Sequence, residues 1–261
     1  MSLMRSSISI TWAVWKALFL REAVARLFAG RAAWVWILAE PIVHLLFLLV
    51  LFGLYLKQVV SGIDGGLFIM TGLLGFFMVQ NTALRCKDAI DANAALFAYR
   101  QVLAVDTVLV RATVEAVLLL LCALVLLAGL GLLGYKVVPQ NFLLVMLSFA
   151  ALWLAGIGLG LVLSVGSELI PEVGKVAGIL FRPLYFLSSV MYPASAISPA
   201  YRDWFLLNPL LHGIETLRAG FFPQYHVISG VSLAYLVGFA MVTVFLGLAL
   251  HVRFAPRLIA Q

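Results

Sequence analysis

The stretch that decides the fold runs from Arg182 to Tyr225: RPLYFLSSVMYPASAISPAYRDWFLLNPLLHGIETLRAGFFPQY. It is too apolar for a soluble loop, and proline interrupts it too often for one membrane-spanning helix. Ser198-Pro199 and Asn208-Pro209 each place a residue that favours the N-cap before a proline at the first helical position. They predict two short helices, from about Pro199 to Leu207 and from about Pro209 to Ala219.

The second of these helices is amphipathic and is expected to end with Gly220 as its C-cap. One face of its helical wheel carries Leu210, Ile214 and Leu217, and the other carries His212, Glu215, Thr216 and Arg218. Two half-helices between long apolar runs indicate a re-entrant hairpin over residues 193–226. Broken backbone at membrane depth is tolerated where protein buries it or where it lines an aqueous cavity. We therefore expect the hairpin to lie beside a pathway rather than against lipid.

The composition is that of a membrane protein. Of the 261 residues 64% are hydrophobic and 11% are charged, and the mean hydropathy is +1.13. An average soluble domain has about 25% charged residues. The net charge of +6 is attributed to the lysine and arginine excess of cytoplasmic loops. Cys86 and Cys122 lie in unlike surroundings and indicate neither a disulfide framework nor a metal site.

We predict an all-α membrane protein with a single domain over residues 1–261 and six transmembrane helices. The predicted spans are residues 33–56, 66–84, 108–134, 142–165, 176–192 and 227–250. Each apolar run is long enough, or nearly so, to cross a bilayer core of about 30 Å. Residues 1–31 combine tryptophans with lysines and arginines, which predicts an interfacial amphipathic helix on the cytoplasmic face.

Several polar residues fall inside the predicted spans. Glu40 and Arg182 lie at similar depths, and we expect them to form an ion pair because a lone charge in lipid is costly. For His44 we expect a hydrogen bond inside the bundle. Arg111 and Glu115 lie one helical turn apart and could neutralise each other.

The segment 85–107 holds the largest cluster of charge between two spans. At its centre Leu96, Phe97, Tyr99 and Arg100 combine aromatic, aliphatic and cationic side chains. A solvated loop rarely exposes such residues together unless something covers them. A docking helix for a cytosolic partner and packing against the chain's own spans both remain open.

The distribution of basic residues predicts the orientation. With the N-terminus in the cytoplasm, eleven of the 17 lysines and arginines lie in cytoplasmic segments and four, Lys57, Lys136, Arg202 and Arg218, lie outside. Both termini are therefore expected in the cytoplasm and the hairpin on the outer side.

At the outer hairpin the aromatic residues Tyr192, Tyr201, Trp204, Phe221 and Phe222 could stack on sugar faces or form an interfacial belt. Arg202 and Arg218 are expected to form local salt bridges with Asp203 and Glu215. The alternative is that these arginines guide an anionic polymer past a gate.

Motifs that carry chemistry are missing from the sequence. Gly174-Lys175 is the only Gly-Lys pair, valine follows it, and the phosphate-binding loop pattern is not met. No HExxH, CxxC or GxSxG occurs. We expect no catalytic residue, no metal and no cofactor bound by this chain, and energy supplied by a partner or an ion gradient.

Taken together, three segments resemble the membrane subunits of ABC-2 type exporters, and specifically the capsular polysaccharide export permeases of the KpsM type. The resemblance rests on residues 21–52 (REAVARLFAGRAAWVWILAEPIVHLLFLLVLF), on residues 96–102 (LFAYRQV) and on the proline-broken stretch 182–222. The run NPLLHGIETLRAGFFP, residues 208–223, is its most specific part.

The resemblance implies a homodimer in the bacterial inner membrane, paired with two nucleotide-binding subunits that carry ATP and Mg²⁺. It further implies a periplasmic co-polymerase, an outer-membrane export protein and a lipid-linked polysaccharide as substrate, with no nucleic acid. Leu96, Phe97, Tyr99 and Arg100 would then form the ATPase-coupling loop. Alternatives are a permease for O-antigen, teichoic acid or a small drug, and, from other classes, an ion-coupled carrier or a membrane-embedded transferase. Against a carrier, the first half shows no second broken hairpin.

Overall fold

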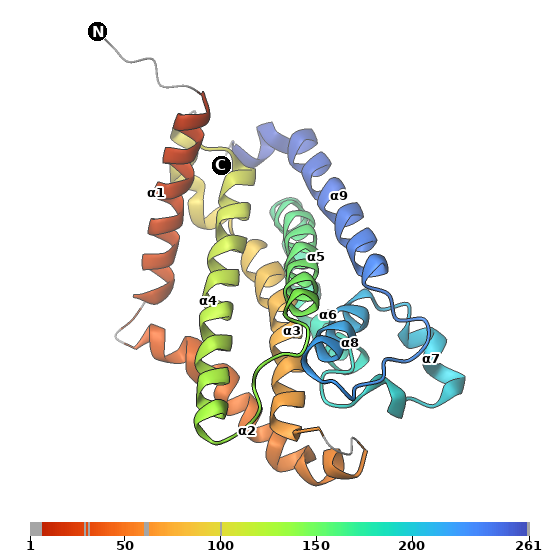
Figure 1. Ribbon diagram of the computed structural model, residues 1–261. Helices are drawn as coiled ribbons and strands as arrows, with labels where there is room; N and C mark the ends of the chain where they lie inside the picture. Colours follow the sequence, from red (N-terminus) through yellow and green to blue (C-terminus); the bar gives the residue numbers. More distant parts are fainter. Residues whose placement is uncertain (1–6, 29, 31, 60–62, 100, 260–261) are drawn as a thin grey trace.

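The computed structural model describes residues 7–28, 30, 32–59, 63–99 and 101–259. Within these ranges every regular element is a helix (Figure 1). The α-helices are α1 (Ser7–Leu27), α2 (Ala33–Val59), α3 (Gly65–Cys86), α4 (Ala104–Leu132), α5 (Phe142–Leu169), α6 (Pro171–Leu187), α7 (Pro199–Phe205), α8 (Pro209–Phe221) and α9 (Leu233–Ile259). Two 3-10 helices, η1 (Asp91–Ala98) and η2 (Ala194–Ala196), complete the described elements. The prediction of an all-helical protein is confirmed.

Five of the described helices, α2, α3, α4, α5 and α9, have the length and apolar composition to cross a membrane. The predicted fifth span, residues 176–192, differs from the helix that forms. α6 covers Pro171–Leu187, and 17 residues rise about 25 Å, less than the thickness of a bilayer core. It begins early because Pro171 takes the first helical position, and it ends early because Ser189 adopts a left-handed conformation with a φ of 57°.

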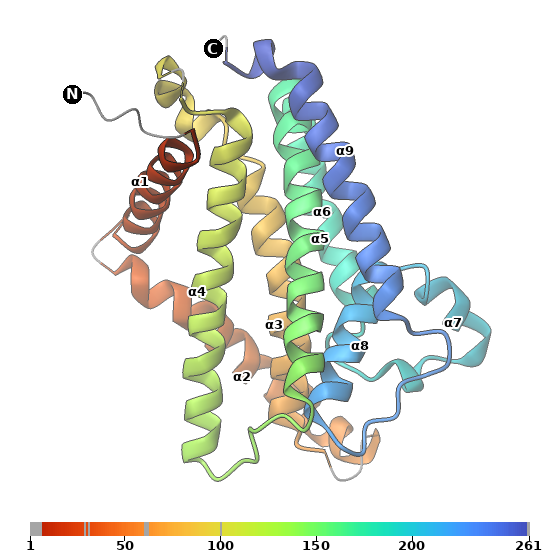
Figure 2. The same cartoon turned by 45° about the horizontal axis from the view of Figure 1, so that its top comes forward.

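The helices form a bundle with α3 near its centre (Figures 1 and 2). The start of α1, η1 and the end of α9 lie at one end of the bundle, which we call the terminal end. The α4–α5 connection, α7 and α8 lie toward the other, which we call the hairpin end. α8 packs against α3, α5 and α9, so the second half-helix is enclosed by the bundle, whereas the described residues of α7 are half-buried or exposed.

Small residues let α5 approach α3 and α9 closely. A Cβ atom added at Gly156 would lie 2.9 Å from Cβ of Thr82, and one at Gly160 would lie 2.6 Å from Cβ of Cys86. At Gly158 an added Cβ would collide with Thr243 of α9. Gly156 and Gly160 form a GxxxG pair, which by itself is weak evidence for a dimer and here packs α5 against α3 within the chain.

Polar contacts join α1 to α4. Glu22 accepts a hydrogen bond of 2.5 Å from Arg111, and Arg26 lies 3.0 Å from Glu115. The indole of Trp15 donates to Asp106 over 2.9 Å. The expected pairing of Arg111 with Glu115 is wrong, because each finds an opposite charge on α1 instead.

The two half-helices begin as predicted but end differently. Asn208 caps α8 by accepting a hydrogen bond of 3.1 Å from the Leu210 amide, while Ser198 lies at the N-cap of α7 without such a bond. Gly220 is not the C-cap of α8, which continues to Phe221. It is required for packing instead, since an added Cβ would lie 2.8 Å from Cγ2 of Val145 on α5.

Candidate functional site

A cavity of about 570 Å³ lies between α2, α3 and α6, and the loop after α6 contributes Met191 to its lining. Most of the lining is aromatic or aliphatic. The polar side chains among it are Glu40, His44, Gln80, Asn81, Arg182 and Tyr185. Ionisable and amide groups inside a membrane bundle usually face one another or water. This cavity therefore combines aromatic and aliphatic walls with a set of polar and charged groups.

His44 and Tyr185 join the two sides of the cavity. The His44 ring nitrogen Nε2 lies 3.0 Å from the Tyr185 hydroxyl, and the imidazole also meets the Phe77 ring edge-on, with centroids 5.6 Å apart. The expectation of a hydrogen bond inside the bundle is confirmed.

The expected ion pair between Glu40 and Arg182 does not form among the described residues. Both side chains line the same cavity and are exposed in it. The two side chains therefore share one cavity without forming an ion pair. Water in the cavity can solvate both charges, so direct contact is not required.

A second hollow, of about 610 Å³, runs along α2 and shares Glu40, His44 and Phe47 with the first. All of its lining residues belong to α2. Its far side is open in the single chain, and Trp36 and Val43 on its wall are 70% and 64% exposed. The cavity thus opens along a strongly apolar helix face.

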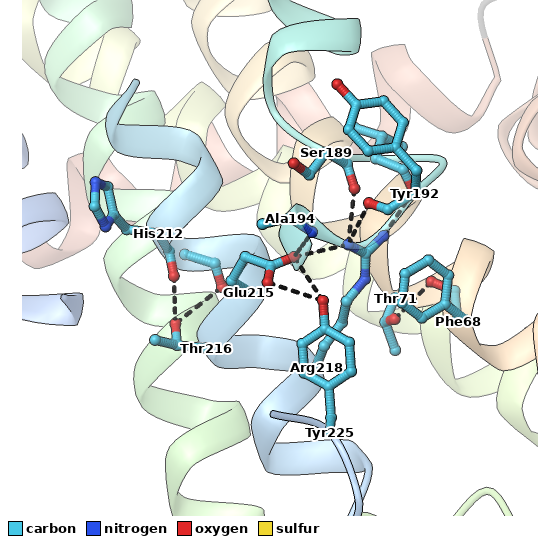
Figure 3. A network of polar contacts seen from close by, with 12 residues as sticks. Phe68, Thr71, Ser189, Tyr192, Ala194, His212, Glu215, Thr216, Arg218 and Tyr225 are labelled. Carbon is cyan, nitrogen blue, oxygen red and sulfur yellow. Dashed lines mark hydrogen bonds and ion pairs between the residues drawn. The ribbon is translucent and has the colours of Figure 1, made fainter. Parts of the chain in front are cut away.

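Beside the cavity, α8 carries a fully buried ion pair (Figure 3). Arg218 Nη1 lies 3.1 Å from Glu215 Oε1, and both side chains are 0% exposed. The guanidinium also donates to three backbone carbonyl oxygens, those of Ser189 (2.7 Å), Val190 (2.7 Å) and Tyr192 (3.3 Å). Its carbon lies 3.7 Å from the centroid of the Phe68 ring, a cation–π contact strengthened by the absence of water.

The Glu215 carboxylate accepts hydrogen bonds from two further groups. The Tyr225 hydroxyl lies 2.8 Å from both carboxylate oxygens, and the Ala194 amide donates over 3.4 Å (Figure 3). Burial raises the pKa of the Glu215 carboxyl, and the adjacent Arg218 guanidinium acts in the opposite direction. A buried pair of this kind depends on both members, because removal of one leaves an uncompensated charge.

The local sequence explains how the guanidinium reaches this position. An added Cβ at Gly72 of α3 would lie 2.5 Å from Arg218 Nη2 and would collide with the Val190 carbonyl oxygen. Ser188 donates to the Leu184 carbonyl oxygen (2.6 Å) and accepts from Asn208 (2.9 Å), which ties the end of α6 to the start of α8.

The other residues predicted for the pathway lie apart from the cavity. Tyr201 and Trp204 on α7 are 63% and 73% exposed. Arg202 donates to the Ile197 and Ser195 carbonyl oxygens rather than pairing with Asp203. The Tyr192 hydroxyl donates to the Phe186 carbonyl oxygen over 2.6 Å.

Phe221 and Phe222 are largely buried. They line a different cavity, of about 650 Å³, between the α2–α3 and α4–α5 loops and the end of α8. Neither they nor the α7 aromatics line the cavity between α2, α3 and α6.

The described residues of the segment proposed for ATPase coupling differ in their exposure to solvent. Phe97 is buried in a cluster with Ile90 and Leu258, Leu96 is half-buried and Tyr99 is 66% exposed. Arg100 lies outside the described residues. η1 also contacts α1 through a hydrogen bond from Arg21 to Asn93.

Five residues of these sites were not predicted from the sequence: Gln80, Asn81 and Tyr185 in the cavity, and Phe68 and Tyr225 in the buried network. The adjacent amides of Gln80 and Asn81 inside an apolar helix are a usable signal, since polar residues in spans are costly and face the interior. The roles of Phe68 and Tyr225 depend on contacts between distant segments and have no local signature. Among the described residues no group of histidine, cysteine, aspartate and glutamate side chains could hold a metal ion.

Comparison with known proteins gives consistent matches. Residues 13–222 match the ABC-2 type transporter family. The polysialic acid transport protein KpsM of Escherichia coli is 36% identical over 247 residues, which are 95% of this chain and 95% of that protein. The capsule polysaccharide export inner-membrane protein CtrC of Neisseria meningitidis serogroup B is 28% identical over 95% of this chain and 94% of its own length. BexB of Haemophilus influenzae, described in the same words as CtrC, is 24% identical over 98% of this chain and 97% of its own length.

Proposed function

Because the chain belongs to the ABC-2 type transporter family, we propose that it is the permease subunit of an exporter that moves a lipid-linked capsular polysaccharide from the cytoplasm to the periplasm. The observation that carries the proposal is the 36% identity, over 95% of both chains, with a polysialic acid transport protein. The cavity between α2, α3 and α6 supports it, because aromatic walls with amide and charged groups suit a hydroxyl-rich polymer.

The chain acts in this proposal as a homodimer. The hollow along α2 is walled by α2 alone, and its exposed apolar face would be covered by the second copy. Two copies facing each other across this surface would enclose a path lined by both sets of Glu40, His44 and Arg182.

Energy comes from two separate nucleotide-binding subunits that hold ATP and Mg²⁺. The sequence lacks the phosphate-binding loop that such chemistry requires. Tyr99 is an exposed aromatic residue near the terminal end and is our candidate contact for these subunits. A periplasmic co-polymerase and an outer-membrane export protein would receive the polymer on the other side of the membrane.

The proposed topology has six crossings with both termini in the cytoplasm. The start of α1 and the end of α9 lie at the same end of the bundle (Figure 1), which supports an even number of crossings. α6, together with the loop that follows it, would supply the crossing that is missing from the five candidate helices. α7 and α8 would form the re-entrant hairpin at the outer side.

The test is deletion of the gene in its source organism and measurement of surface and intracellular polysaccharide. Loss of surface capsule with accumulation of lipid-linked capsular polymer inside the cell is expected, and the parent chain should restore export. An Arg182→Gln variant should restore less than the parent, because it removes the cation of the cavity, while a Lys136→Gln variant away from the cavity serves as control. A normal capsule after deletion, or accumulation of O-antigen, teichoic acid or a drug instead, would contradict the proposed substrate.

A further inference from the structure

The buried network on α8 and the cavity meet at Met191. This side chain lines the cavity and is 6% exposed. The carbonyl groups on either side of it, those of Val190 and Tyr192, accept hydrogen bonds from Arg218. One guanidinium therefore fixes the backbone that places part of the cavity wall.

The backbone held in this way is strained. Ser189 has a φ of 57°, a left-handed conformation that glycine adopts readily and serine does not. Such conformations persist where surrounding contacts hold them. The Ser189 carbonyl oxygen is 2.7 Å from Arg218 Nη1, so the strained residue is bound directly by the same side chain.

Charge and geometry both suit arginine at this position. The planar guanidinium presents several donors in fixed directions and stacks on a ring. Here it reaches three carbonyl oxygens, one carboxylate and the Phe68 ring at once. A lysine could neutralise Glu215 but could not make this set of contacts together.

We propose that Arg218 is a positioning residue that holds residues 189–192 and thereby places Met191 in the wall of the transport cavity. It acts on the exported polymer through Met191, since its own side chain is 0% exposed and cannot contact the polymer. This inference rests on the proposed function and assigns the predicted gate arginine a role behind the wall of the pathway.

The test uses two glycine substitutions one helical turn apart on α3. Gly72→Ala places a methyl group against Val190 and Arg218, whereas in Gly75→Ala the three atoms nearest the methyl group belong to Ile214, Leu152 and Leu217, at 3.2–3.4 Å. Both are combined with Met191→Cys in the full-length chain, with Cys86 and Cys122, which are both buried, replaced by alanine. The rate at which the introduced thiol reacts with a membrane-impermeant maleimide is measured in lipid nanodiscs, where both membrane faces are accessible.

Gly72→Ala should raise the modification rate about tenfold over the parent, because loss of one hydrogen bond to a charged group shifts a local opening equilibrium by about that factor. Gly75→Ala should leave the rate near that of the parent. Equal rates in the two variants, with both chains folded, would overturn the proposal.

Arg218→Lys gives a second measurement that keeps the buried charge. It should also expose the introduced thiol, while Leu217→Ala, which loses buried packing on the same helix, should not. If Leu217→Ala exposes that thiol as much as Arg218→Lys does, the effect is general loosening of α8 and the positioning role is refuted.

The maleimide reaction requires no polysaccharide, so it separates the two proposals. A difference between Gly72→Ala and Gly75→Ala in a protein that exports no capsular polymer would leave the positioning role intact and refute the substrate assignment alone. Reduced capsule export in Gly72→Ala relative to Gly75→Ala would connect the loop to transport.

Discussion

At the scale of single residues, α8 shows that polar side chains can be structural parts of a membrane protein core. His212 is 2% exposed, and its two ring nitrogens have different partners. Nε2 lies 2.8 Å from the Leu206 carbonyl oxygen, while the Ser232 amide donates to Nδ1 over 3.0 Å. This arrangement requires the neutral ring with its proton on Nε2, since a protonated Nδ1 could not accept the Ser232 amide.

His212 should make stability depend on pH. Burial lowers the pKa of His212 below its ordinary value of 6.5, with the Leu206 carbonyl acting in the opposite direction. The unfolded chain therefore binds a proton at a pH where the folded protein does not, and stability is lost as pH falls below about 6.5. The loss should grow as pH falls from 6.5 towards the lower pKa of the folded protein.

The measurement is the change in Tm between pH 7.5 and pH 5 in detergent for the parent and for His212→Gln. The variant should show a smaller change than the parent, because its amide does not titrate. The remaining histidines and carboxyl groups titrate in both proteins and cancel in the comparison. An unchanged pH dependence in the variant would show that His212 does not carry the effect.

At the scale of elements, the attachment of α1 to α4 is a testable pair of contacts. Arg111→Glu should bring like charges together at Glu22 and should destabilise the protein by about 1.5–3 kcal/mol, the value of a hydrogen bond between charged groups. The double change Glu22→Arg with Arg111→Glu restores opposite charges and should recover much of the loss. Thermal unfolding of the three proteins measures both effects, and equal Tm values for the single and double variants would exclude the pairing.

The segment around η1 offers a second prediction, because Phe97 within the helix and Tyr99 directly after it have different surroundings. Phe97→Ala removes a buried ring and should cost about 3–5 kcal/mol of stability. Tyr99→Ala changes an exposed ring and should leave the Tm near that of the parent while weakening co-purification of the nucleotide-binding subunit, since aromatic anchors often dominate interfaces. If Tyr99→Ala retains the subunit fully, Tyr99 is not a docking residue.

The local sequence determines where α8 begins but not where α6 ends. The N-cap of α8 followed from Asn208-Pro209, because capping and proline geometry are local. The early end of α6 could not be predicted, because the reversal at Ser189 depends on Arg218, which lies 29 residues further along the chain. Amphipathicity also misled: the polar face of α8 indicated exposure to water, but Tyr225, Phe68 and the loop after α6 cover it.

At the scale of the whole molecule, composition and hydropathy were sufficient for the class of protein and for the approximate place of most long helices. The cavity was predicted only in part. Glu40, His44 and Arg182 were recognised as costly inside a membrane, but their shared cavity depends on how α2, α3 and α6 pack. Packing of this kind is set by contacts such as that of His44 on α2 with Tyr185 on α6, which no periodicity reveals.

The buried network has a consequence for the order of synthesis. Its members come from α3, the loop after α6, α8 and the segment before α9, so that the contacts span residues 68 to 225 of a chain of 261. The ribosome produces the chain from its N-terminus, and α3 is therefore made long before the side chains that cover Phe68 and Gly72 exist. This face of α3 therefore lacks its native contacts in the nascent protein until α8 has been synthesised. Tyr225 is synthesised later still and is the last donor to Glu215. The centre of the bundle is thus completed near the end of translation, by the segment that also forms the hairpin.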